Sequence, residues 1–410
     1  YVLSHAGTAQ ARIWQTNPSG AFASVPSSGL VVTGLGARLR SGVEFSTGTV
    51  LRPQLEPGVF ATQFERRPRA LELLLCERRN DAAFVAPNVP QRNWLTSQAW
   101  IGSSSAAAYD WQSICWAPEL GLFAAIAISG TGNRVMTSPD GVNWTARASA
   151  ADNNWRSVCW AREIGLFVAI SSSGTGNRVM TSPDGVTWTL RVSAAENTWR
   201  SVCWARELRL LVAVAQSGTG NRVMTSPDGV NWTARVSAAD NGWLSVCWSC
   251  ELGLLVAVSS SGTGNRVMTS PDGVTWTLRV SAADNDWYGV CWSPELGLFV
   301  AVASTGTGNR VMTSPDGVNW TLRASAADNS WRSVCWAREI GLFAAVAATG
   351  TGNRVMTSPD GVNWSLRTSA TDNNWAGVCW APELGLFAAV AGGTGNFAMT
   401  SKSAFSIAYR

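Results

Sequence analysis

Acidic, amide and tryptophan side chains recur together along most of this chain. Asp152 and Asn153 stand shortly before Trp155, and Asn177 follows in a glycine-rich turn. Sugars are held by fixed hydrogen-bond donors and acceptors beside an aromatic ring, so this combination predicts carbohydrate binding. Several weak sites would together gain affinity for a dense glycan surface. The candidate glycan-binding residues are Asp152, Asn153, Trp155, Asn177, Asn197, Trp199, Asn221, Asp240, Asn241, Trp243, Asn265, Asp284, Asn285, Trp287, Asn309, Asp328, Asn329, Trp331, Asn353, Asp372, Asn373 and Trp375.

The same residues also admit a structural interpretation. Asn and Asp side chains commonly satisfy the backbone groups of turns. A tryptophan at the start of an inner strand is more often a core residue than an exposed platform. Loops can also be alike because the repeats were duplicated recently. Calcium is a weaker alternative because each loop offers a single carboxylate, and no metal or cofactor is expected.

A repeat of 44 residues organises these groups. It is marked by one cysteine in each copy, at Cys115, Cys159, Cys203, Cys247, Cys291, Cys335 and Cys379. A period of this length indicates one supersecondary unit that has been copied and stacked. We interpret the cysteines as small buried hydrophobic residues.

The copy that starts at Trp155 predicts four short strands. Gly-Thr-Gly and Pro-Asp-Gly lie at fixed offsets between apolar runs, and no 3.6-residue pattern supports helices. Four strands in 44 residues match one propeller blade. Seven copies therefore predict an all-β, seven-bladed β-propeller, with an open β-solenoid as the alternative. The expected strands cover residues 155–160, 166–170, 177–181 and 186–191.

The ends of the repeat array indicate how the ring closes. The last copy loses its Pro-Asp-Gly turn, so an outer strand must come from elsewhere. Residues near Trp94 are the first candidate, and Phe405 to Tyr409 are the alternative. We expect a small β-rich domain in residues 1–88, which docks the propeller to a larger assembly or oligomerises, and the propeller itself in residues 89–410. Within residues 1–88 we expect strands at 30–33, 43–45, 59–62 and 70–75.

A second recurring phrase is Ser138-Pro139-Asp140-Gly141, followed by Trp144. It resembles the Asp box of sialidase-like and BNR-type propellers, although the spacing between Gly and Trp is one residue shorter. The resemblance implies that the aspartate is structural and faces away from any active site. Similar repeat propellers occur in surface proteins of phages and large viruses and in lectins. The turn aspartates are Asp140, Asp184, Asp228, Asp272, Asp316 and Asp360.

An enzyme is not expected from these residues. A catalytic site needs different groups with different pKa values at one place, whereas the repeat supplies the same groups many times. The only histidine, His5, precedes the repeats. We find no zinc spacing, phosphate loop or nucleophile elbow. The net charge of +4 without a basic run argues against nucleic acid as a partner, and no apolar stretch is long enough for a membrane span.

The residue that follows the repeated tryptophan varies among the copies of the repeat. The residue after it is Gln112, Arg156, Arg200, Leu244, Tyr288, Arg332 or Ala376. A strictly seven-fold ligand array does not require such variation, and a single protein partner could read one sector of it. The leading hypothesis is a non-enzymatic propeller for adhesion, extracellular or on a virion surface, that binds glycans. The alternative is a protein–protein assembly scaffold without a small ligand, and a glycosidase is the third possibility.

Overall fold

The computed structural model describes residues 100–393 and 397–401, together with the backbone of five strands nearer the N-terminus. The chain divides into two compact units, Tyr1–Arg79 and Asn80–Arg410, a boundary slightly before the one expected. The described strands of the first unit form two antiparallel sheets, β3-β1-β5 and β2-β4. The strands expected at 59–62 and 70–75 lie outside the described residues. The bounds are β1 (Val2–Gly7), β2 (Ala11–Gln15), β3 (Leu30–Val31), β4 (Ser41–Phe45) and β5 (Val50–Glu56).

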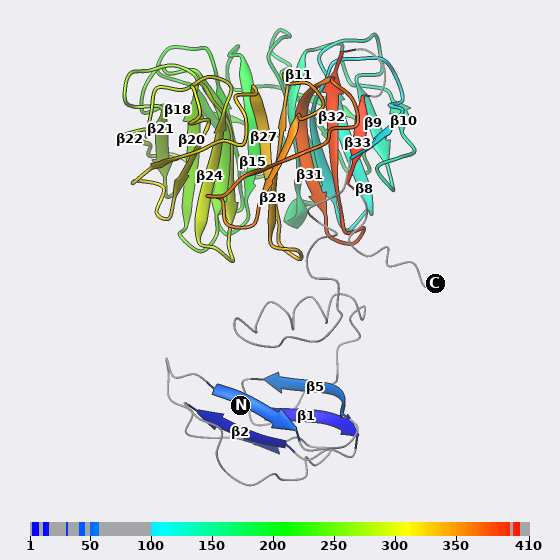
Figure 1. Ribbon diagram of the computed structural model, residues 1–410. Helices are drawn as coiled ribbons and strands as arrows, with labels where there is room; N and C mark the ends of the chain where they lie inside the picture. Colours follow the sequence, from blue (N-terminus) through cyan, green and yellow to red (C-terminus); the bar gives the residue numbers. More distant parts are fainter. Residues whose placement is uncertain are drawn as a thin grey trace. The chain divides into compact units, whose positions relative to one another are not determined.

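The second unit is a propeller of seven four-stranded antiparallel blades (Figure 1). This confirms the predicted fold class. The first blade consists of β7 (Trp111–Ala117), β8 (Leu122–Ala127), β9 (Val135–Ser138) and β10 (Thr145–Arg147). The second consists of β11 (Trp155–Ala161), β12 (Leu166–Ser171), β13 (Val179–Ser182) and β14 (Thr189–Arg191). The third consists of β15 (Trp199–Ala205), β16 (Leu210–Ala215), β17 (Val223–Ser226) and β18 (Thr233–Arg235). Within the described residues, no helix has both the length and the apolar character needed to cross a membrane.

The remaining four blades repeat the same order of strands from the axis outward. The fourth and fifth are β19 (Trp243–Ser249), β20 (Leu254–Ser259), β21 (Val267–Ser270) and β22 (Thr277–Arg279), and β23 (Trp287–Ser293), β24 (Leu298–Ala303), β25 (Val311–Ser314) and β26 (Thr321–Arg323). The sixth is β27 (Trp331–Ala337), β28 (Leu342–Ala347), β29 (Val355–Ser358) and β30 (Ser365–Arg367). The seventh combines β31 (Asn374–Ala381), β32 (Leu386–Gly392) and β33 (Ala398–Thr400) with β6 (Ile101–Ser103) from the start of the unit.

Each hydrophobic core lies between two neighbouring blades. Ala124 and Ile126 of β8 face Trp155 and Phe167 of the next blade in one cluster of buried side chains. This is why the second and third strands are buried along almost their whole length, while the outer strands are only partly covered. The repeated cysteines pack against these clusters as free thiols, and burial raises the pKa of Cys203 to about 12.

A belt of Trp–Glu hydrogen bonds ties every blade to the one before it. Trp160 Nε1 donates to Glu119 Oε2 at 2.7 Å, and the same bond recurs around the ring. The belt is completed by Trp116 Nε1, which donates to Glu383 Oε2 at 2.6 Å across 267 positions of sequence. The ring is therefore closed, and the open solenoid is excluded.

Strand β6 supplies the outer strand of the seventh blade by pairing with β33. The expected source near Trp94 lies outside the described residues, as does the alternative at Phe405 to Tyr409. The N-terminal side was the right choice, but Trp100 is the residue that matches the repeat. It stacks on Phe387 with ring centroids 6.0 Å apart, at the place where Trp144 packs against Phe123 in a tilted arrangement at 6.2 Å.

The Ser-Pro-Asp-Gly phrase forms the turn between the third and fourth strands. Asp140 Oδ1 accepts the backbone N–H groups of Val142 and Asn143, both at 2.8 Å. Gly141 follows with φ of 75°, a left-handed conformation that favours glycine. Partial burial opposes ionisation of Asp140, but the hydrogen bonds from Asn143 and Val142 outweigh it and lower its pKa to about 2.

These turns predict a stability change in acid. The pKa is lowered in all six turn aspartates, so their ionised forms stabilise the fold above the unfolded pKa of about 3.9. This contribution is lost as the pH falls toward about 2. We expect the melting temperature to fall steeply over that window, as followed by circular dichroism. Asp140→Asn should flatten the pH dependence, and an unchanged slope in several such variants would contradict the assignment.

Candidate binding site in the central cavity

The predicted acid–amide pairs lie in the connectors between blades and hold those blades together. Asp152 Oδ1 accepts the backbone N–H of Gly132, in the preceding blade, at 2.7 Å. Asn153 Nδ2 donates to the carbonyl oxygen of Asn177, in the following blade, at 2.9 Å. One connector therefore bridges the glycine-rich loops of two neighbouring blades through Asp152 Oδ1 and Asn153 Nδ2.

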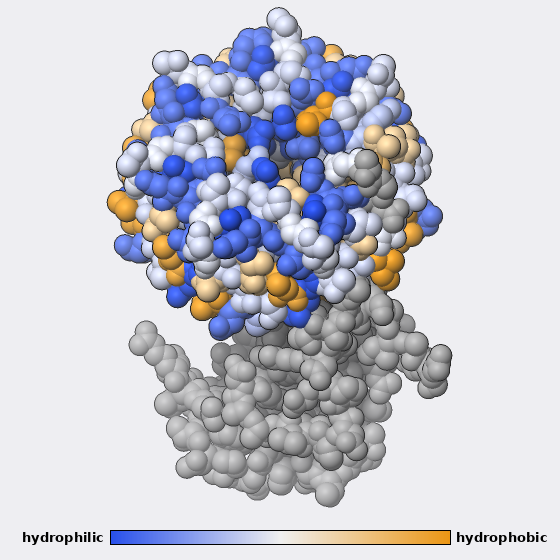
Figure 2. Space-filling view, turned by 45° about the horizontal axis from the view of Figure 1, so that its top comes forward, coloured by the Kyte–Doolittle hydropathy of each residue, from blue (hydrophilic) through white to orange (hydrophobic). Residues whose placement is uncertain are grey.

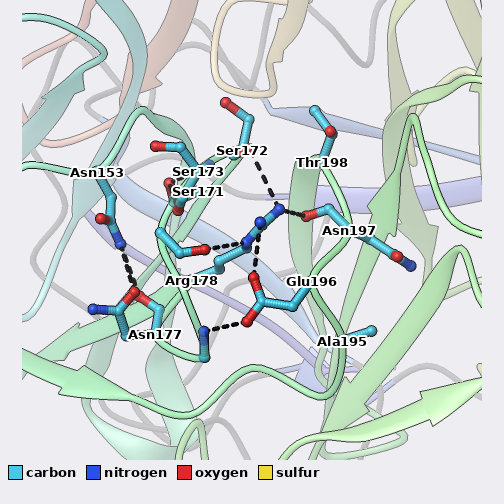
Figure 3. Close-up of polar contacts among 12 residues, drawn as sticks. Asn153, Ser171, Ser172, Ser173, Asn177, Arg178, Ala195, Glu196, Asn197 and Thr198 are labelled. Carbon is cyan, nitrogen blue, oxygen red and sulfur yellow. Dashed lines mark hydrogen bonds and ion pairs between the residues drawn. The ribbon is translucent and has the colours of Figure 1, made fainter.

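The repeated arginine completes this connection, as Figure 3 shows for the blade that carries glutamate in place of aspartate. Arg178 Nη2 pairs with Glu196 Oε2 at 2.8 Å. Its Nε donates to the carbonyl oxygen of Gly174 and its Nη1 to that of Asn197, both at 2.8 Å. The arginines that repeat identically are thus structural residues of the blade junctions.

The position of the repeated tryptophans differs from the predicted stacking surface for sugars. Their side chains are 0% exposed, and Trp155 Nε1 donates to the carbonyl oxygen of Ala151 at 3.0 Å. A sugar would therefore find no ring face at these positions, and the expected stacking surface is absent. The fully buried residues are Trp155, Trp199, Trp243, Trp287, Trp331 and Trp375. Glycan binding by the remaining acid and amide groups stays a prediction.

The junction between the last and first blades is built differently. Ala108 and Tyr109 stand where other connectors have an acid and an asparagine, and Phe397 stands where they have the arginine. Tyr109 Oη donates to Asn133 Oδ1 at 2.7 Å, and Phe397 is buried in the apolar cluster that Tyr109 also contacts. This seam replaces the polar connection with aromatic packing.

A cavity of about 620 Å³ lies at the centre of the ring, where the inner strands begin. Figure 2 brings forward the end of the ring that carries the blade connectors, and it shows mostly hydrophilic residues around a hollow. Each blade contributes to the lining the residue that follows its inner tryptophan. These residues are Gln112, Arg156, Arg200, Leu244, Tyr288, Arg332 and Ala376. The positions at which the repeats differ therefore meet in one place.

Tyr288 organises two of the three arginines in this cavity. Arg200 Nη2 is 3.0 Å from Tyr288 Oη in a hydrogen bond, and the Arg332 guanidinium lies 4.1 Å from the centre of the same ring. Such cation–π contacts strengthen where water is excluded. Blades that lie apart in the sequence thus present a connected group of cationic side chains.

Arg156 is held separately and experiences the repulsion of its neighbour. Its Nε donates to Ser172 Oγ at 3.0 Å and its Nη1 to Gln112 Oε1 at 3.2 Å. Burial and the charge of Arg200 lower the pKa of Arg156 to about 10, partly offset by Tyr288 and Asp110. The side chain is still protonated at neutral pH, so the cavity has a net positive charge.

Sequence reasoning identified these variable positions but did not combine them into a site. It treated them as a sector that a single protein partner could read and placed the candidate glycan site in the repeated loops. The signal was present, because three arginines and one tyrosine occupy positions where a strict repeat would have one residue type. Only the ring geometry shows that residues 44 or more positions apart line the same cavity.

Comparison with known proteins identifies the fold. No protein-family model and no curated protein matches the chain. Among solved structures, the β-propeller domain of Cps50 (Swd1) from Myceliophteria thermophila matches with a TM-score of 0.54 and 12% identity, over 74% of this chain and 100% of that one. Raptor from Chaetomium thermophilum matches with a TM-score of 0.56 and 9% identity, over 76% of this chain and 30% of that one. At these identities the likeness establishes the propeller alone, and the Asp-box assignment stays a prediction.

Proposed function

We propose that this protein is a non-enzymatic propeller scaffold that binds a protein partner on the end of the ring around the central cavity. The observation that carries the proposal is the unequal lining of that cavity. The seven nearly identical blades place five different residue types, three of them arginines, at the one equivalent position that lines it. A partner that binds across the ring makes use of such differences, whereas a ligand bound once per blade does not.

An apolar arc on the same end of the ring supports a protein partner. Val192, Val236 and Val280 follow the outer strands of three adjacent blades and are 73%, 74% and 76% exposed. The equivalent positions elsewhere are Ser104, Ala148, Ala324 and Thr368. Exposed apolar side chains grouped on one sector are typical of protein interfaces rather than of sugar-binding surfaces.

Site-specific photo-crosslinking tests this proposal in cells that produce the protein. We expect Val236→p-benzoylphenylalanine to form an adduct with one discrete protein. The matched control is Val186→p-benzoylphenylalanine, because Val186 is an exposed valine in the Asp184 turn at the opposite end of the blade. Equal adducts from both positions would overturn the proposal. Binding to a glycan array that is lost when Asp152, Asp240, Asp284 and Asp328 are changed to Ala, in a variant that circular dichroism shows to be folded, would favour the glycan hypothesis instead.

A further inference from the structure

The central cavity presents many more hydrogen-bond donors than acceptors. The guanidinium groups of Arg156, Arg200 and Arg332 line it, and each carries five N–H donors and no acceptor. The carboxylate of Asp110 is the acidic group among the lining residues. A ligand that complements this lining must bring negative charge and acceptor atoms.

Serine hydroxyls on the inner strands add neutral donors to the same wall. Ser113 Oγ accepts the backbone N–H of Val158 on the next inner strand at 3.2 Å. Ser157, Ser201 and Ser245 accept in the same way at 3.2 Å, and Ser333 at 3.3 Å. Because each oxygen is fixed as an acceptor, its own hydrogen remains to be donated to a ligand. All five serines line the cavity.

The cationic groups are held in place before any ligand arrives. Arg200 and Arg332 are fixed by Tyr288, and Arg156 is fixed by Ser172 and Gln112. Little side-chain freedom is left to lose on binding, which favours affinity. An anion between Arg156 and Arg200 would also relieve the repulsion between them.

The size and the apolar part of the cavity indicate what carries the anion. A volume of about 620 Å³ exceeds about twentyfold the ~30 Å³ that one water molecule occupies in the liquid, so a lone inorganic ion would leave most of it empty. Leu244, Ile114 and Val290 contribute apolar surface to the lining. A glutamate side chain combines a carboxylate with methylene groups and suits both parts of this wall.

We infer that the central cavity binds carboxylate side chains of an acidic segment in the protein partner. The inference rests on the proposed scaffold function and specifies the chemistry of its partner. The three arginines bind carboxylate oxygens through pairs of N–H groups, the serine hydroxyls donate to the remaining lone pairs, and Leu244 contacts the methylene groups. Asp110 at the margin disfavours a second acidic group beside it.

Titration calorimetry with the full chain and a hexaglutamate peptide tests the inference. We expect binding at low ionic strength that weakens as salt is added, because exposed charges are screened. Arg200→Gln and Arg332→Gln should each weaken binding about tenfold or more, since charge-assisted hydrogen bonds are lost. Arg206→Gln is the matched control, because Arg206 is 60% exposed in the turn after β15 and its loss changes the net charge equally. Circular dichroism melting confirms that each variant is folded.

Each outcome separates the inference from the scaffold proposal. Equal weakening in Arg206→Gln would show attraction to net charge and overturn the site. Binding of inorganic phosphate or of an oligoglucuronate in place of the peptide would overturn the acidic segment as the ligand. No peptide binding, combined with a Val236 adduct, would overturn the cavity site while the scaffold proposal stands. Peptide binding without any adduct would overturn the scaffold proposal instead.

Discussion

A chain that lacks residues 1–103 is expected to lose the closed ring, whereas one that lacks residues 1–79 keeps it. The longer deletion removes β6, its antiparallel pairing with β33, and the buried Trp100 side chain. Loss of a buried tryptophan alone costs about 3–5 kcal/mol. The edge of β33 would also be left without a partner, which promotes association between chains.

Differential scanning calorimetry and analytical ultracentrifugation measure this result. We expect the melting temperature of the longer deletion to drop by on the order of 10 °C and the sample to self-associate. Residues 80–410 form one of the two compact units, so the shorter deletion is the control and should melt as the intact propeller does. Equal melting of both deletions would show that β6 does not close the ring. Trp100→Ala in the full chain isolates the packing contribution.

Replacing a single inner tryptophan should also have a large effect. Trp199 is fully buried between two blades, so Trp199→Ala removes most of the apolar contacts at that place. The expected loss is about 3–5 kcal/mol of unfolding free energy, measured by guanidinium denaturation. Trp232, which is only partly buried in its turn, provides a matched control: Trp232→Ala should cost clearly less.

This substitution also separates the two interpretations of the tryptophans. A residue that served as an exposed platform for sugars would lose binding on substitution without loss of stability. Destabilisation by Trp199→Ala with a normally folded Trp232→Ala variant agrees with the buried position. The reverse order of stabilities would place Trp199 on the surface in solution.

Most of the blade was predictable from the sequence because the same strand and turn patterns recur in every copy of the repeat. The expected strands at 155–160 and 166–170 agree with β11 and β12 to within one residue. The outer strand, expected at 186–191, is shorter because Asp184 Oδ1 accepts the N–H groups of Val186 and Thr187. Those residues therefore belong to the turn, and β14 begins only at Thr189.

The candidate site was harder to predict because it depends on the whole ring. Whether Trp155 faces solvent or the preceding blade is decided by packing between blades, which no local pattern encodes. The same holds for Arg156 and Tyr288, which lie three blades apart in the chain and line one cavity. Their departure from the repeat was visible, but its meaning required the geometry of closure.

The aromatic packing of Tyr109 and Phe397 distinguishes the junction between the last and first blades from the other junctions of the ring. The six other junctions carry nearly the same polar groups, so one blade edge could dock on almost any other, within a molecule or between two. Tandem repeats are prone to such exchange during folding. Tyr109 and Phe397 fit poorly against an acid and an arginine but well within their shared cluster. We therefore expect the seam to favour pairing of the last blade with the first over pairing with any other blade edge.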